Sequence, residues 1–271
     1  MSVSGSLALA AAASLASLGA PDPTAGGALL SAAESVDWWL VGDPADWWFV
    51  VRNADYLGGG LLLTVGLTVA SILLGFLVGF PAGAVEVYGD GLSKRLVETA
   101  GVVLRGTPIV VILLVMYFVL GVPQVNLGVG SISPAISAGI LGLGLRSAAY
   151  QSQIFRASLS SVDDGQLEAG RAVGLSRFEA IRYVVVPQAL RRSIPGFQNE
   201  FTIVLKDTSI VFAIGLAELL TRGYDLFTEQ TTAVLEVILF ISAIYFVLTF
   251  TTNRALDYLG TRYAIPEGES A

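Results

Sequence analysis

The sequence contains no cysteine and no histidine among its 271 residues. Without cysteine the chain forms no disulfide, thiolate nucleophile or thiolate metal site, and without histidine it lacks the commonest general base and zinc ligand. A phosphate loop of the form G-x-x-x-x-G-K-[ST] is also missing, because Lys94 follows a serine and Lys206 a leucine. We therefore expect no catalytic residues, no metal and no cofactor, and we assign any ATP hydrolysis to a separate subunit.

Charge is scarce as well. Only 14% of the residues are charged, 54% are hydrophobic and the mean hydropathy is +0.71, whereas soluble domains carry roughly 25% charged residues. This composition predicts an integral membrane protein.

The first 46 residues differ from the rest, because acidic side chains gather there although the net charge of the whole chain is only -7. The stretch "LALAAAASLASLGA" is too short to span a bilayer and follows no basic residue, so it favours neither a signal peptide nor an extra helix. We expect residues 1–46 to form an acidic, low-complexity extracytoplasmic segment.

Five stretches approach the roughly 20 apolar residues that a helix needs to cross a bilayer core of about 30 Å. They lie at residues 56–85, 102–122, 133–155, 197–220 and 234–252, and the fourth is interrupted by Glu200, Lys206 and Asp207. Small residues recur at helical spacing in the first and third stretches, which predicts close helix packing. We expect an all-α membrane protein with five transmembrane helices in residues 47–260, followed by a tail at 261–271.

Lysine and arginine follow the first, third and fifth stretches, whereas the loop after the second stretch has none and the loop after the fourth has one. The positive-inside rule then places the N-terminus outside and the C-terminal tail in the cytoplasm of a cell-membrane protein. The charged segment after the third stretch is cytoplasmic in this arrangement.

That segment, about residues 163–187, has the signals of a helix–turn–helix. Asp163 with Gln166 predicts a capping box for a first helix, and Ser176 with Glu179 predicts one for a second. Gly174 suits the left-handed conformation that ends the first helix.

Pro187 is expected to limit the second helix, because the residue before a proline is driven out of the helical region. Leu175, Phe178 and Ile181 are expected to form an apolar knob between the arginines. An amphipathic helix resting on lipid headgroups is an alternative interpretation of the same pattern.

The spacing within "EAGRAVGLSRFEAIRYVVVP" resembles the EAA loop of ABC-importer permeases. Glu168, Ala169, Gly174 and Pro187 match that pattern, while Gly170 replaces an alanine and Val184 and Val186 replace isoleucine and leucine. The segments "RGTP", "AAYQSQIFR", "PQALRRSIPGFQNEF" and "KDTSI" follow in the order of the landmarks of polar amino acid permeases of the histidine/glutamine type.

This resemblance implies the type I ABC importer permease fold, with an EAA loop that couples to a cytoplasmic ABC ATPase. The coupling residues would be Glu168, Ala169, Gly174, Phe178 and Pro187. The implied partners are the ATPase subunits, an extracytoplasmic substrate-binding protein and a second permease subunit, either a copy or a paralogue. The implied function is import of a polar amino acid.

The resemblance also implies a substrate site, formed by Gly106, Thr107, Pro108, Gln153, Lys206, Asp207 and Thr208. Charged side chains at membrane depth mark such sites by default, which adds Arg146 as a candidate, either in the site or in a structural ion pair. Gln153 stands where many relatives have glutamate. We take this as a hypothesis for glutamine, glutamate or another polar amino acid rather than arginine.

Two other functions remain open. An ion-gradient-driven secondary transporter of small polar solutes would explain the membrane charges but not the EAA spacing. A membrane hydrolase could use Lys206 with Ser209, although their three-residue spacing is common in helices.

Overall fold

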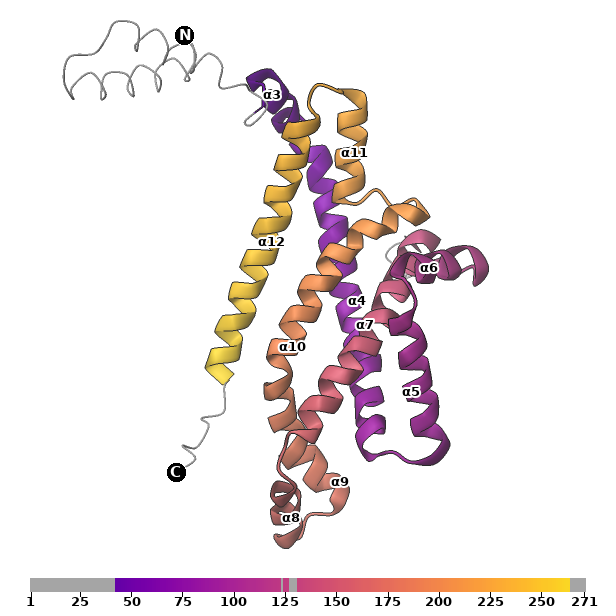
Figure 1. Cartoon of the computed structure of the whole chain (residues 1–271), viewed down its shortest axis with the longest axis vertical. Coiled ribbons are helices and arrows are strands. Elements are labelled where there is room, and N and C mark those ends of the chain that lie inside the picture. The colour runs from indigo at the N-terminus through magenta and orange to yellow at the C-terminus, as the bar shows by residue number, and fades with distance from the viewer. Residues whose placement is uncertain (1–41, 123, 127–130, 264–271) are drawn as a thin grey trace, which may run out of the picture.

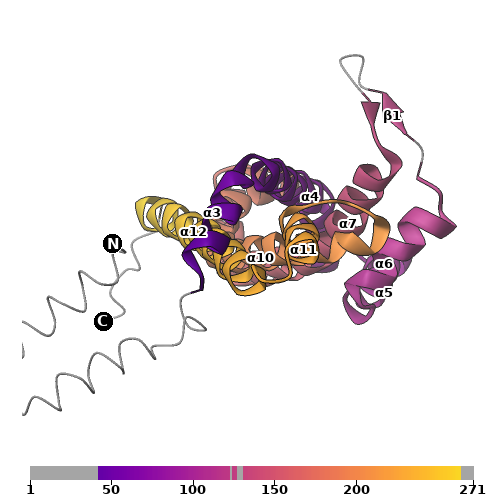
Figure 2. The ribbon, with the colours of Figure 1, turned by 90° about the horizontal axis from the view of Figure 1, so that it is seen from above.

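The computed structural model describes residues 42–122, 124–126 and 131–263, so most of the acidic N-terminal segment lies outside the described part (Figure 1). The first half of this part contains α3 (Pro44–Arg52), α4 (Ala54–Tyr88), α5 (Gly91–Gly106), α6 (Ile109–Leu114) and the π-helical turn η2 (Val115–Val119). A hairpin of β1 (Val125–Asn126) and β2 (Ser131–Ile132) follows and extends away from the bundle (Figure 2).

The second half contains α7 (Pro134–Ser160), α8 (Asp164–Ala172), α9 (Arg177–Ala180), the π-helical turn η3 (Ile181–Val185), α10 (Val186–Asp207), the 3-10 helix η4 (Thr208–Ile214), α11 (Leu219–Glu229) and α12 (Val234–Tyr263). The predicted all-α class is confirmed. Helix α3 begins before residue 47, so the expected domain boundary falls inside a helix.

Helices α4 and α7 form the centre of the bundle and pack at very short range. A Cβ atom placed on Gly79 or Gly83 of α4 would come within 2.7 Å of a backbone carbonyl oxygen of α7. The ring of Phe155 on α7 contacts Phe80 and Phe197 at centroid distances of 5.1 and 5.4 Å, which ties α10 to the same centre. The predicted close packing at small residues is confirmed.

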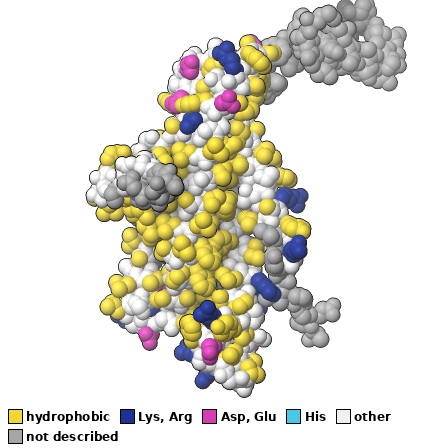
Figure 3. All heavy atoms as spheres, turned by 180° about the vertical axis from the view of Figure 1, so that it is seen from behind, with side chains coloured by type: hydrophobic (Ala, Val, Ile, Leu, Met, Phe, Trp, Pro, Cys, Tyr) yellow, Lys and Arg dark blue, Asp and Glu magenta, His cyan; other side chains and the backbone are white. Residues whose placement is uncertain are grey.

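Two helices are long and apolar enough to cross a membrane on length and composition alone, among the residues that the structure describes. They are α4 and residues 234–258 of α12, with mean hydropathies of 2.5 and 2.3 over their most apolar windows. Helices α7 and α10 have 27 and 22 residues, enough to cross, but carry charged side chains. On the face shown in Figure 3, acidic side chains lie near the two ends of the molecule and apolar side chains cover the band between them.

Two of the expected spans are not continuous helices. Residues 102–122 bend by 108° between α5 and α6, because Thr107 precedes a proline and is extended. Residues 197–220 leave the α-helix after Asp207, tighten into η4 and end at Gly215, whose φ is +79°. Both breaks occur in the segments "RGTP" and "KDTSI", so the irregular backbone coincides with the predicted substrate site.

Pro187 does not end the second helix of the helix–turn–helix, contrary to expectation. The backbone amide of Val186 donates to the carbonyl of Ile181, five residues earlier, and the wider π-helical turn η3 leads directly into α10. Pro187 then directly follows this π-helical turn, and the irregular turn accommodates a residue that has no N–H to donate. The helix therefore runs without a break from the cytoplasmic loop into the bundle.

Candidate functional site

The first candidate site is the helix–turn–helix of α8 and α9, which projects from one end of the bundle (Figure 1). Asp163 caps α8 by accepting a hydrogen bond of 2.8 Å from the Gly165 amide. The rest of the predicted capping box is wrong, because the side chain of Gln166 accepts a bond from Gln188 of α10 instead. That bond joins α8 to α10 rather than closing its own end.

The capping box of α9 is confirmed. The Ser176 side chain accepts from the Glu179 amide, and the Glu179 carboxylate accepts from the Ser176 amide at 2.9 Å and its hydroxyl at 2.6 Å. Both bonds lower the pKa of Glu179, and the bond from the Ser176 hydroxyl is the larger cause. The stabilisation from this cap is therefore fully present above the ordinary pKa of glutamate. It is lost as the pH falls through the lowered pKa of Glu179.

The turn between the two helices depends on two glycines. Gly174 has a φ of +95°, a conformation that other residues adopt only with strain. Gly170 is buried, and a Cβ atom there would lie 3.1 Å from the Cβ of Ala180. The glycine that departs from the EAA pattern thus lets α8 pack closely against α9.

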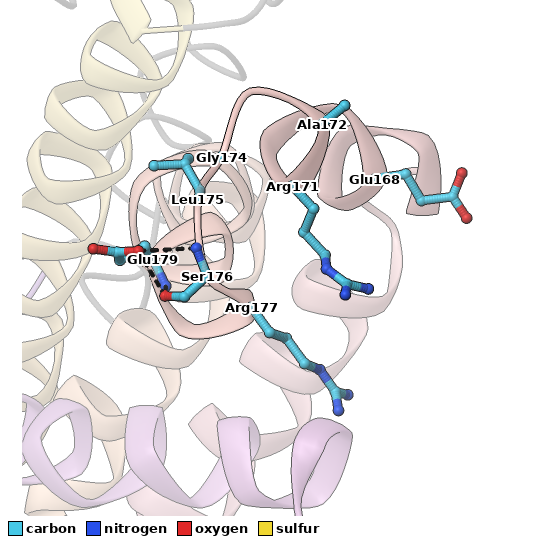
Figure 4. Close-up of a pocket in the computed structure, with 8 residues that line it drawn as sticks. All are labelled: Glu168, Arg171, Ala172, Gly174, Leu175, Ser176, Arg177 and Glu179. Atoms are coloured by element: carbon cyan, nitrogen blue, oxygen red, sulfur yellow. Dashed lines mark hydrogen bonds between the residues drawn. The ribbon is translucent and has the colours of Figure 1, made fainter.

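The outer surface of the loop is exposed and mixed in character. Phe178 is 69% exposed, and Glu168 and Ala169 are also on the surface. Leu175 and Ile181 are half-buried, so the predicted apolar knob is smaller than expected and consists mainly of Phe178. An open hollow of about 740 Å³ lies between the two helices, and the side chains of Arg171 and Arg177 extend on the same side of it (Figure 4). Such a surface suits contact with another protein.

The base of the loop is attached firmly to the bundle. Leu159, Val162, Val185 and Ala189 form an apolar cluster at the junction of α7, η3 and α10. Arg192 of α10 also donates to the backbone carbonyl and hydroxyl of Ser161, just before α8. These contacts fix the base of the loop to α7 and α10.

The second candidate site is polar and lies at the end of α10. Arg146 of α7 and Asp207 form an ion pair with an N–O distance of 2.5 Å, and the guanidinium also lies over the Tyr150 ring at 5.1 Å. Lys206 is exposed and its ammonium has no hydrogen-bond or ion-pair partner in the described part of the chain. Asp207 thus pairs with Arg146 rather than with its neighbour, and Lys206 is left available.

The hydroxyls of "KDTS" are occupied by backbone groups. Thr208 is buried and donates to the carbonyl of Leu205 at 2.7 Å, while Ser209 donates to the carbonyl of Lys206 at 2.8 Å. The Ser209 hydroxyl therefore does not face the Lys206 ammonium as a hydrolytic dyad would require.

Gln153 lies about two helical turns along α7 from Arg146 and belongs to another cluster. Its amide donates to the carboxylate of Glu86 of α4 at 2.6 Å, and Ser152 donates to the same carboxylate at 3.1 Å. Arg156 approaches Glu86 to 3.5 Å. The structure therefore does not bring Gln153 together with Lys206 and Asp207.

The "RGTP" segment forms the bend between α5 and α6. Arg105 fixes this bend to α7 through a hydrogen bond of 2.6 Å to the carbonyl of Ala149, and the Thr107 hydroxyl donates to the carbonyl of Val103. Gly106 and Pro108 are exposed. In a single chain this part of the predicted substrate site is open to the surface.

Five carboxylates that the structure describes as buried were not predicted as functional: Asp46, Glu86, Glu200, Glu218 and Glu236. Glu86 lies just beyond the first apolar stretch, and Glu200 accepts a hydrogen bond of 2.7 Å from Ser147. Glu218 is fully buried and accepts from the amides of Leu220 and Thr221 at the start of α11 and from Tyr245 of α12. The sequence signal for Glu218 is an acidic residue directly before a helix, the usual place of a capping side chain.

A helical membrane bundle with broken helices beside intramembrane charges, and with a stiff helix–turn–helix at one end, defines a membrane transport permease of the type I ABC importer fold. The family described as "Binding-protein-dependent transport system inner membrane component" matches residues 55–265. The chain belongs to this family.

Named relatives agree with this membership. The chain is 34% identical to the glutamine transport system permease protein GlnP of Escherichia coli over 206 residues, which are 76% of this chain and 92% of that protein. It is 39% identical to the probable amino-acid permease protein YxeN of Bacillus subtilis over 153 residues, 56% of this chain and 66% of that protein.

Solved structures show the same fold. The crystal structure of an amino acid ABC transporter with histidines superposes with a TM-score of 0.68 at 35% identity, covering 79% of this chain and 96% of that one. An inward-facing structure of the MetNI methionine ABC transporter superposes with a TM-score of 0.63, covering 82% of this chain and 100% of that one. At 19% identity the second likeness supports the fold alone.

Proposed function

We propose that this chain is the permease subunit of an ATP-driven importer of polar amino acids, docked through α8 and α9 to a separate cytoplasmic ATPase. A second permease subunit completes the translocation path, and an extracytoplasmic binding protein delivers the substrate. The N-terminus lies outside and the C-terminus in the cytoplasm. The names of the relatives, permeases for glutamine and for amino acids, support this substrate class.

One structural feature carries the coupling role. Helices η3 and α10 run without a break from Ile181, next to the exposed loop, to Asp207, which pairs with Arg146. These 27 residues span about 40 Å at about 1.5 Å per residue. A displacement of α8 and α9 by a partner would therefore reach the polar site along one continuous helical segment.

The residues implied for coupling have distinct roles in this proposal. Glu168, Ala169 and Phe178 are exposed and would contact the ATPase, whereas Gly174 fixes the angle between the helices. Pro187 lies where the loop becomes α10.

The polar site suits a zwitterion. The free ammonium of Lys206 would attract the substrate carboxylate, and Asp207 with Arg146 would supply a carboxylate and a second cation. Gly106, Thr107 and Pro108 would face this path from the bend of α5 and α6, and Thr208 would fix the backbone of the helix break. The substrate class does not depend on Gln153, since the carboxylate of Glu86 lies beside it.

The test is substrate-stimulated ATP hydrolysis in proteoliposomes that contain this chain with its co-expressed ATPase and binding protein, screened over polar and charged amino acids. We expect one loaded binding protein to stimulate hydrolysis and uptake, and Glu168→Ala to reduce both. Uptake that follows an ion gradient without any ATPase would contradict the proposal and favour a secondary transporter.

A further inference from the structure

Helix α3 lies outside the residues that the family pattern covers, which begin at residue 55. It is found at the end of the molecule opposite α8 and α9 (Figure 1) and lies across the bundle beside α12 (Figure 2). Asp43 caps it and Pro44 occupies its first turn, so the sequence specifies this helix locally. Nothing in the transport mechanism above uses it.

The inner side of α3 is fixed to the bundle by polar and apolar contacts. The Asp43 amide donates to the buried carboxylate of Glu236 of α12 at 2.7 Å. The Asp46 carboxylate, itself buried, accepts from the side chains of Gln230 and Thr232 in the connection between α11 and α12. The side chains of Phe49 and Val50 pack into one apolar cluster with residues of α4, α11 and α12. The orientation of α3 about its own axis is therefore set.

The side of α3 that faces outward is apolar except at its end. Trp48 is 67% exposed and Val51 is 52% exposed, and the charged Arg52 follows them on the same face. Because the inner contacts hold the helix, this face cannot turn inward to bury the indole. Adjoining apolar side chains that are held outward in this way mark a surface for contact with lipid or with another protein.

The position of α3 along the chain identifies that surface. Helix α4, which is apolar enough to cross a membrane, begins at Ala54, only two residues after α3 ends. In a bilayer that α4 crosses, the outward face of α3 would lie near the level where the hydrocarbon core gives way to headgroups. Tyr56 and Tyr224 are exposed at the same end, and Tyr224 contacts Phe227 with a centroid distance of 5.0 Å. Tryptophan and tyrosine concentrate at this depth of a bilayer.

We propose that α3 is an interfacial helix, with Trp48 and Val51 seated in the bilayer at the boundary between headgroups and acyl chains. Arg52 extends to the lipid phosphates, as basic side chains near helix ends do. The leaflet is the one opposite the α8–α9 loop. The contacts to Asp43, Asp46 and Phe49 then hold the outer ends of α11 and α12 at a fixed depth.

The sequence makes a direct test possible, since all four tryptophans lie between residues 38 and 48. The full-length variant Trp38→Phe/Trp39→Phe/Trp47→Phe leaves Trp48 as the only indole. It is reconstituted in vesicles of phosphatidylcholine with bromine at shallow or deep acyl positions, and iodide is added to the water phase. We expect shallow bromines to quench Trp48 strongly, deep bromines less, and iodide weakly.

A matched control comes from the opposite end of the chain. Phe178 is 69% exposed, nearly the same as Trp48. Phe178→Trp in a variant with the four native tryptophans changed to phenylalanine should show no quenching by brominated lipid and several-fold stronger quenching by iodide. The indoles at positions 48 and 178 are then similarly exposed in the protein, and their quenching compares a lipid with a water environment.

The proposal is overturned if Trp48 is quenched by iodide as strongly as the probe at position 178 and is insensitive to bromine. It is also overturned if only the loaded binding protein shields Trp48, which would make the face a protein docking site. Should the triple variant fail to assemble, the same comparison is made between the unmodified chain and Trp48→Phe. A quenching by bromine that Trp48→Phe leaves undiminished would equally overturn the proposal.

Discussion

Gln153 of α7 donates a hydrogen bond of 2.6 Å to the buried carboxylate of Glu86 near the end of α4. Ser152 donates to the same group at 3.1 Å, and the guanidinium of Arg156 lies 3.5 Å away. This contact joins the two central helices at the end that bears the coupling loop. The side-chain amide of Gln153 is thus hydrogen-bonded to a carboxylate of α4, and we infer that Gln153 positions α4.

The first prediction follows from this contact. Gln153→Glu places two carboxylates against each other, and we expect a lower thermal midpoint of the solubilised protein, from a loss of about 1–3 kcal/mol. Adding Glu86→Gln restores one donor and should recover most of the loss. Gln166→Glu, at an exposed position that only accepts a hydrogen bond, is the control. A selective gain of cationic substrates without destabilisation would contradict this account.

A second prediction concerns the turn of the coupling loop. Gly174→Val forces a β-branched residue to a φ of +95°, at a local cost of about 1–2 kcal/mol, and should change the angle between α8 and α9. We expect transport to fall while the ATPase still hydrolyses ATP without substrate. Gly121→Val introduces a similar strain at a φ of +56° far from the loop. Equal loss of coupling in both variants would show that general instability is the cause.

A third prediction separates the two cations of the polar site. Lys206→Ala removes an exposed ammonium without a partner among the residues described, so we expect unchanged thermal stability but a large loss of uptake. Arg146→Ala leaves Asp207 unpaired and should lower both thermal stability and uptake. The loss of stability should be less than the roughly 3–5 kcal/mol of a fully buried pair, because both side chains are about one fifth exposed. Normal uptake by Lys206→Ala would remove that residue from the substrate path.

A fourth prediction tests the buried cap of α11. Glu218→Ala leaves the partly buried amides of Leu220 and Thr221 without their acceptors, and we expect a loss below the roughly 1–3 kcal/mol that each fully buried unsatisfied group costs. The Tyr245 hydroxyl also loses the carboxylate to which it donates. Glu218→Gln keeps an acceptor oxygen and should lose much less stability. Equal thermal midpoints of the two variants would contradict the role of the Glu218 carboxylate as a cap.

Much of this fold could be predicted from the sequence because its signals are local. The long apolar runs specify α4 and α12, and Ser176 with Glu179 specifies the start of α9. The pattern did not predict that the helix continues through Pro187, because the π-helical turn before it depends on several backbone bonds at once.

The candidate sites were harder to predict. Sequence spacing places Lys206 and Asp207 together, but it does not tell which of them is paired, and only the packing of α7 against α10 brings Arg146 to Asp207. The bond between Gln153 and Glu86 joins residues 67 positions apart and has no local signal. Contacts between distant helices are set by packing, which single residues do not reveal.

The proposed function requires that the α8–α9 loop bind an ATPase subunit. The chain has no cysteine, so Phe178→Cys introduces a unique site for a thiol-specific crosslinker, and Glu229→Cys introduces another exposed site at the end of α11. In membranes that contain the co-expressed ATPase and binding protein, we predict a crosslink to the ATPase from position 178 and none from position 229. The absence of any such crosslink at 178, with uptake still intact, would contradict the account.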